Sequence, residues 1–184
     1  MAVRENLKQI VAELSDYSVE LDDKQAEAFL KNIQQAKHIF LAGAGRSGLA
    51  IRAFANRLLH LGFEVSLVGE ISSPHSHPGD LLIICSGSGE TGSLVELAKK
   101  AKKNKVAVTL VSMKEDSTIG QLATSTLILP GKLKDEGDIE GFSQPMGTAF
   151  EQLAFLTFDA LVLDLMATLD EDSETMFARH ADFE

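Results

Sequence analysis

Two short loops of glycine and hydroxyl residues constrain the fold of this chain more than any other feature. Residues 42–48 read Ala-Gly-Ala-Gly-Arg-Ser-Gly and residues 85–92 read Cys-Ser-Gly-Ser-Gly-Glu-Thr-Gly; each loop follows an apolar run and opens a helical pattern. Such a loop leaves backbone N–H groups free at the start of a helix, where the helix dipole adds positive potential. After neighbouring parallel strands, two such loops meet at the carboxyl edge of one sheet. The pattern predicts a phosphate site there.

The alternation of apolar runs and helical patterns predicts an α/β fold. Strands are expected at 38–42, 64–68, 80–85, 106–112 and 125–129, with helices at 47–61 and 91–104 and a short turn near 117–122. Runs that are apolar throughout, such as residues 81–84, suit a parallel sheet covered on both faces. Right-handed crossovers then give a doubly wound, flavodoxin-like five-stranded parallel sheet in the order 2-1-3-4-5.

Helical segments flank this core within one predicted domain. Amphipathic patterns over residues 7–17 and 23–36 predict an N-terminal helical extension (1–36) before the α/β core (37–130) and the C-terminal helices (145–184). The segment 146–169 is apolar on nearly every side, and one sheet can cover only one side of it. The other side must meet the N-terminal helices or another subunit, so we expect a homo-oligomer.

Charge and cysteine content narrow the class of protein. The 184 residues carry a formal net charge of −10, which argues against a nucleic-acid partner. The single cysteine, Cys85, ends an apolar strand and is predicted to be a core thiol in a reducing compartment. The N-terminus does not resemble a signal peptide, and no uninterrupted apolar stretch spans a bilayer. We therefore expect a cytoplasmic protein without a membrane partner.

The loops favour a phosphate ester that is bound but not transferred. Neither loop contains a P-loop lysine, and no aspartate-tipped strand is placed to hold magnesium. Gly43-x-Gly45-x-x-Gly48 matches a dinucleotide fingerprint, with Glu70 near the expected position of a ribose-binding acid. The hydroxyl-rich second loop favours phosphate-ester binding over a dinucleotide. The structural alternative is that these glycines only form tight strand-to-helix turns.

Glu151 and two histidines are candidates for proton transfer. Near the start of the long apolar segment, Glu151 could be a general base, or it could complete a capping box with Thr148. His60 could polarise a carbonyl, or it could only interact with the dipole at a helix C-terminus. His180 is either an exposed tail residue or a residue that reaches a neighbouring subunit.

His75-x-His77 together with Glu70 resembles a fragment of a metal site. Because this spacing is not specific and the loop is flexible, no metal is predicted.

With these residues in view, the whole chain resembles the sugar isomerase (SIS) domain family, and within it the 6-phospho-3-hexuloisomerase branch. The motifs that carry the resemblance span residues 42–47, 54–62, 86–91, 145–151 and 176–181. The resemblance implies interconversion of 3-hexulose 6-phosphate and fructose 6-phosphate through an enediolate, after formaldehyde fixation on ribulose 5-phosphate. It also implies a tetramer with sites near subunit boundaries and no cofactor.

The resemblance further implies roles for individual residues. Glu151 would be the base, and His60 and His180 would assist it. The phosphate would be held by the loop residues Gly45, Arg46, Ser47, Ser86, Ser88 and Thr91. Two alternatives stay open: a related isomerase of the arabinose 5-phosphate type, and a non-catalytic sugar-phosphate-binding regulator, which would not need Glu151. Sugar length and stereochemistry also stay open.

Overall fold

A central parallel sheet organises the computed structural model, which describes residues 2–132 and 143–182. Its strands are β1 (Ile39–Gly43), β2 (Val65–Leu67), β3 (Leu81–Cys85), β4 (Ala107–Ser112) and β5 (Ser125–Ile128). They pair in the order β2-β1-β3-β4-β5, and every pair is parallel. The doubly wound five-stranded sheet and its strand order are thus confirmed.

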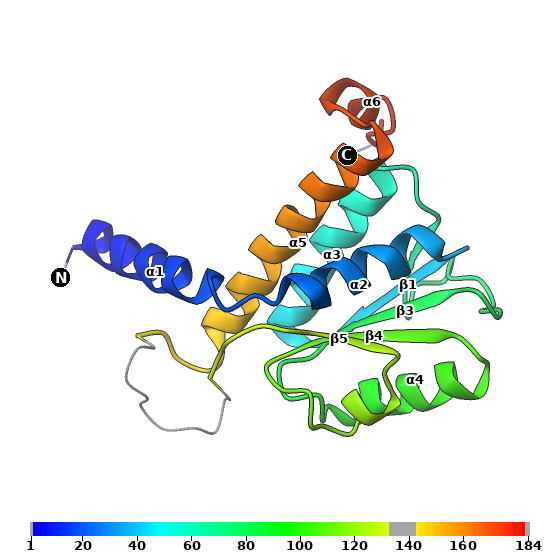
Figure 1. The fold of residues 1–184 in the computed structure, drawn as a ribbon, viewed down its shortest axis with the longest axis horizontal. Coiled ribbons are helices and arrows are strands. Elements are labelled where there is room, and N and C mark those ends of the chain that lie inside the picture. The colour runs from blue at the N-terminus through cyan, green and yellow to red at the C-terminus, as the bar shows by residue number, and fades with distance from the viewer. Residues whose placement is uncertain (1, 133–142, 183–184) are drawn as a thin grey trace.

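Helices cover the sheet on both faces, with the 3₁₀ turn η1 (Gly120–Leu122) before β5 (Figure 1). The helices are α1 (Val3–Ser18), α2 (Asp23–Gln35), α3 (Gly45–His60), α4 (Gly92–Lys103), α5 (Thr148–Leu169) and α6 (Ser173–Phe177). They lie within or beside the segments that the sequence predicts to be helical. Residues 1, 183 and 184 of the predicted terminal regions lie outside the described residues.

The strands bury side chains on both faces, as expected of a central parallel sheet. Ile39 and Leu41 of β1 join the larger core with α2, α3 and α5, whereas Phe40 joins the smaller core under α4. The stacked rings of Phe54 and Phe158, with centroids 4.5 Å apart, join α3 to α5. This packing fixes the position of α5 relative to the sheet.

Two glycines of the dinucleotide-like fingerprint allow β1 and α3 to approach closely. A Cβ on Gly48 would lie 2.9 Å from the carbonyl oxygen of Gly43, closer than real Cβ contacts allow. Gly45, which begins α3, has a φ of +58°, a conformation that favours glycine. Turn geometry and packing therefore account for this motif without a dinucleotide.

Apolar side chains stay exposed on α1 and on the outer side of α5. No residue of α1, all of which the structure describes, is buried, and its Leu7 and Val11 are 58% and 57% exposed. On α5, Leu156 and Leu163 are 52% and 67% exposed. Among the described residues, α5 is the one helix long and apolar enough to cross a membrane, a test that core helices also pass. Its inner side packs along α3 (Figure 1).

Candidate active site

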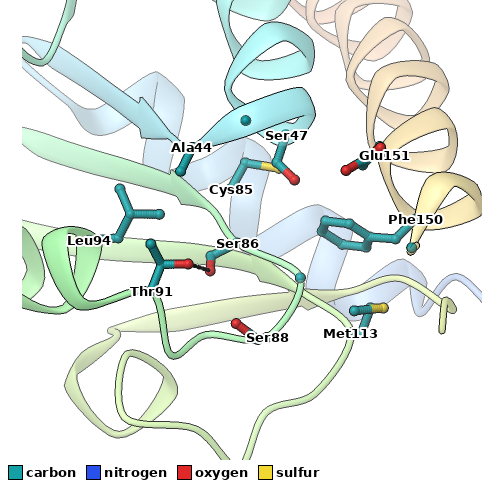
Figure 2. A pocket seen from close by; sticks show the side chains of 13 residues that line it. Ala44, Ser47, Cys85, Ser86, Ser88, Thr91, Leu94, Met113, Phe150 and Glu151 are labelled. Atoms are coloured by element: carbon teal, nitrogen blue, oxygen red, sulfur yellow. Dashed lines mark hydrogen bonds between the residues drawn. The ribbon is translucent and has the colours of Figure 1, made fainter. Parts of the chain in front are cut away.

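A cavity of about 370 Å³ lies where both glycine loops meet the start of α5 (Figure 2). Its lining comes from the β1–α3 turn, the β3–α4 loop, the end of β4 and the first turn of α5. The lining residues are Ala44, Gly45, Ser47, Cys85, Ser86, Gly87, Ser88, Thr91, Leu94, Met113, Gly147, Phe150 and Glu151. The structure thus joins the two loops in one crevice, as the sequence predicts.

Three helices begin at this cavity, which gives it a positive local potential. The N-cap residues of α3, α4 and α5 are Ala44, Thr91 and Gly147, and all three line the cavity. Within the described chain, none of these three side chains caps its own helix by a hydrogen bond. N–H groups of the first turns are therefore available to an anion, and the three dipoles favour negative charge. The site suits a phosphate even in an acidic protein.

Hydroxyl groups line the wall opposite Glu151 (Figure 2). The Oγ atom of Ser86 lies 3.5 Å from Oγ1 of Thr91, and the hydroxyl of Ser88 accepts a hydrogen bond of 3.2 Å from the N–H of Glu90. Of the residues predicted to hold phosphate, Gly45, Ser47, Ser86, Ser88 and Thr91 all line the cavity. Their role as phosphate ligands stays a prediction.

The segment after β4 holds the second loop in place, a contribution that sequence analysis missed. The carbonyl of Gly87 accepts hydrogen bonds from the N–H of Met113 and the hydroxyl of Ser112, each 3.0 Å long. The Glu90 carboxylate accepts a 2.8 Å bond from the N–H of Thr118. Hydrogen bonds from Thr118 hold the pKa of Glu90 below its usual value. Glu90 and Thr118 are 28 residues apart, so no local motif signals their contact.

Glu151 is buried at the edge of the cavity and is paired with a cation. Its side chain is 6% exposed, and one of its carboxylate oxygens accepts a hydrogen bond from Nε of Arg46. The alternative reading of Glu151 as part of a capping box is wrong, because α5 takes Gly147 as its N-cap and Thr148 donates its hydroxyl to the carbonyl of Pro145. Glu151 therefore has a carboxylate at the cavity that helix capping does not use. Arg46, also predicted to bind phosphate, makes this contact to Glu151, and its role as a phosphate ligand stays a prediction.

Cys85 lies at the floor of the cavity, and its thiol stays protonated at neutral pH. Burial, and to a lesser extent the charge of Glu151, raise the pKa of Cys85 to about 12. A thiol that is not ionised is a poor nucleophile. This agrees with the prediction of a core thiol.

His60 and His180 lie together, but in a second cavity of about 440 Å³. Their ring centroids are 5.2 Å apart. Arg179 holds the tail in position: it binds both carboxylate oxygens of Glu171 at 2.9 Å and donates a 3.0 Å bond to the carbonyl of His60. Since His60 ends the 16-residue helix α3 that begins at Gly45, about 24 Å of helix separates it from the phosphate loops of its own chain.

The residues of the suspected metal fragment are arranged differently from a metal site. The rings of His75 and His77 contact each other at a centroid distance of 5.1 Å, and Glu70 pairs with Arg52 at 3.4 Å. Within residues 2–132 and 143–182, no group of three or more His, Cys, Asp or Glu residues is placed to hold a metal ion.

Comparisons with known proteins agree with this geometry. The family model of the SIS domain matches residues 32–144. The chain is 42% identical to a 3-hexulose-6-phosphate isomerase of Bacillus subtilis, with 100% of both chains covered. It is 33% identical to another of Mycobacterium gastri, over 99% of this chain and 92% of that one. It also resembles a crystal structure from Methanococcus jannaschii for which the same function is inferred, with a TM-score of 0.81, 31% identity and coverage of 98% and 99%.

Proposed function

Because the chain belongs to the SIS domain family, we propose that it interconverts 3-hexulose 6-phosphate and fructose 6-phosphate. One observation carries the proposal: a buried carboxylate, Glu151, faces a hydroxyl-lined cavity where three helices begin. An isomerase needs a base opposite a phosphate site, whereas a site that only binds a sugar phosphate does not. The names of the relatives agree with this reaction.

In the proposed reaction, the phosphate anchors the substrate and takes no part in bond changes. We assign its recognition to the amides at the starts of α3 and α4 and to the hydroxyls of Ser47, Ser86, Ser88 and Thr91. This arrangement leaves the carbon chain extending toward α5. A fixed phosphate also holds the reacting carbons beside the base, which lowers the entropic part of the barrier.

Proton transfer by Glu151 moves the carbonyl between C3 and C2. The carboxylate removes the proton from C2 of the hexulose, and the electron pair of that C–H bond forms the C2–C3 double bond of an enediolate with its charge on O3. A proton then passes from O2 to O3, and Glu151 returns its proton to C3 as the C2 carbonyl forms. The product is fructose 6-phosphate, and the base is regenerated. One base on one face can therefore serve both steps.

We further propose that the protein acts as a homotetramer, in which His60 and His180 assist a site of a neighbouring subunit. The exposed apolar side chains of α1 and α5 offer surface for assembly. The length of α3 keeps the two histidines from Glu151 of their own chain, whereas a neighbour could bring its histidine cavity to that site. Mixing Glu151→Gln and His60→Ala chains should then restore activity in part, and no rescue would contradict the shared site.

The cellular setting follows from the proposed substrate. We propose that the protein works in the cytoplasm, in the ribulose monophosphate route of formaldehyde fixation. Its small-molecule partner is the sugar phosphate, and we propose no metal, cofactor, nucleic acid or membrane as a partner. A reaction that only moves a proton and an electron pair within one molecule needs no redox cofactor.

Proton exchange observed by NMR tests the proposed reaction. Fructose 6-phosphate is incubated with the protein in deuterated water, and we expect deuterium at C3, because the 2,3-enediolate forms by loss of that proton. Exchange at C1 instead would indicate an aldose–ketose isomerase. In a parallel incubation with ribulose 5-phosphate, exchange there but not in fructose 6-phosphate would favour the arabinose 5-phosphate alternative. Tight binding without exchange would favour a non-catalytic regulator.

A further inference from the structure

Arg46 makes a contact that phosphate binding alone does not require. It lies in the first turn of α3, and its Nε–H donates to the carboxylate of Glu151. The two side chains differ in exposure, with Arg46 at 61% and Glu151 at 6%. A guanidinium has five N–H donors in a planar fork, and this contact uses one of them. Most of the fork therefore stays exposed while its Nε–H is held against the base. Arg46 itself is not one of the residues that line the cavity, but its neighbours Gly45 and Ser47 are.

The cavity presents different chemistry at its two ends. The end formed by the β3–α4 loop has hydroxyls and the start of α4, which suffice for a phosphate. Beside Glu151, the lining includes the ring of Phe150, which cannot donate a hydrogen bond to an oxyanion, and the hydroxyl of Ser47, which we assign to the phosphate (Figure 2). The proposed enediolate develops its negative charge at this second end. A cation in contact with the base is placed to stabilise that charge.

We propose that Arg46 is a catalytic residue that is shared between the carboxylate of Glu151 and the enediolate oxygen. This inference rests on the proposed isomerase function. Before proton transfer, the charge of Arg46 is balanced by the ionised carboxylate. When Glu151 takes the proton it becomes neutral, and the negative charge moves to the substrate oxygen. The guanidinium then binds that oxygen through its free donors, and the reverse change accompanies return of the proton.

Such an arrangement selects the transition state over the bound substrate. The substrate is neutral at its reacting carbons, so Arg46 gains an anionic partner on the substrate only as the enediolate forms and Glu151 becomes neutral. Interactions that strengthen in this way raise turnover without tightening substrate binding. The planar fork also explains why arginine suits the position better than lysine, whose ammonium is a point charge without a fixed geometry.

The test separates turnover from phosphate recognition in Arg46→Gln and Arg46→Lys. For Arg46→Gln we expect kcat to fall about 100-fold or more, the scale of one lost oxyanion donor, with KM and competitive inhibition by inorganic phosphate within about threefold of wild type. Arg46→Lys should recover only part of the loss. Arg52→Gln is the matched control, because Arg52 lies on the same helix, is 55% exposed and pairs with Glu70 outside the cavity. It should keep wild-type kinetics.

A binding measurement gives a readout that does not depend on turnover. A phosphorylated hydroxamate of matching chain length imitates the enediolate, and calorimetry should show that Arg46→Gln binds it at least tenfold more weakly but binds inorganic phosphate normally. Equal weakening of both ligands, or a rise in KM at unchanged kcat, would return Arg46 to phosphate binding and overturn the proposal. Near-wild-type turnover would overturn it as well. If the wild-type protein fails to exchange C3 of fructose 6-phosphate, the proposed function fails, independently of Arg46.

Discussion

Glu151→Gln should abolish turnover and leave the fold almost unchanged. Glutamine keeps the shape and one carbonyl acceptor but cannot take a proton, and loss of a positioned base costs about 10²- to 10⁴-fold in rate. The stability effect is set by the partner of Glu151. Because the side chain of Arg46 is 61% exposed, water solvates its charge after the substitution. We therefore expect a loss of less than about 1 kcal/mol, or a Tm lower by no more than about 4 °C in a chain of this size.

Two measurements on the same preparation test this expectation. The rate of deuterium entry at C3 of fructose 6-phosphate reports the base, and a thermal melt reports the fold. Asp164→Asn is the control, since it removes an exposed acid from the same helix outside the cavity. Deuterium entry in Glu151→Gln within tenfold of wild type would refute the role of Glu151 as the base. A drop in Tm far beyond 4 °C would instead show that the Arg46 contact is mainly structural.

The phosphate site, the reaction type and the buried thiol each give a further prediction. Ser86→Ala and Ser88→Ala should each weaken substrate binding by about 1–3 kcal/mol, roughly a 5- to 150-fold change, with inorganic phosphate competing; an unchanged KM in both would refute the hydroxyl cradle. Prolonged chelation should leave full activity, and activity restored only by zinc would point back to His75 and His77. Because burial raises the pKa of Cys85 from 9.0 to about 12, the unfolded chain loses this proton first as pH rises. Urea denaturation measures the free energy of unfolding at each pH. The contribution of the Cys85 thiol to it should be complete below pH 9 and should fall by up to about 1.4 kcal/mol per pH unit above that pH. If the free energy of unfolding of Cys85→Ala falls equally steeply above pH 9, this prediction is contradicted.

The fold could be predicted from local patterns because the buried strands of a parallel sheet are continuous apolar runs that can be recognised in the sequence. The run 81–84 is apolar throughout and is buried on both faces of the sheet, and β3 begins at Leu81, one residue after the expected start. Helix starts were also readable, since glycines mark both turns. The sequence placed the start of the 47–61 helix two residues late, because Gly45 and Arg46 belong to its first turn. Glycine is a poor helix former in general, yet it fits the positive φ with which α3 begins.

Contacts between distant segments were the part that local patterns could not provide. Arg46 and Glu151 are 105 residues apart, and either residue alone has an ordinary surface interpretation. The same holds for the bond between Thr118 and Glu90. The spacing of Thr148 and Glu151 fitted a capping box, but the positive φ of Gly147 starts the helix one residue earlier than that motif requires. The three-dimensional structure is needed to decide between a capping role for Glu151 and a contact with a distant residue.

Two adjacent residues of α3 contact different parts of the proposed active site, the phosphate site and the base. Ser47 lines the cavity where we place the phosphate, while its neighbour Arg46 contacts the base on α5. The stacked rings of Phe54 and Phe158 hold α5 against the same helix. The separation between Ser47 and the base is therefore set by one packed helix pair, while the β3–α4 loop supplies the other proposed phosphate contacts. If the phosphate binds where we propose, we expect a substrate whose reacting carbons lie at another distance from its phosphate to place them away from Glu151 and to react more slowly.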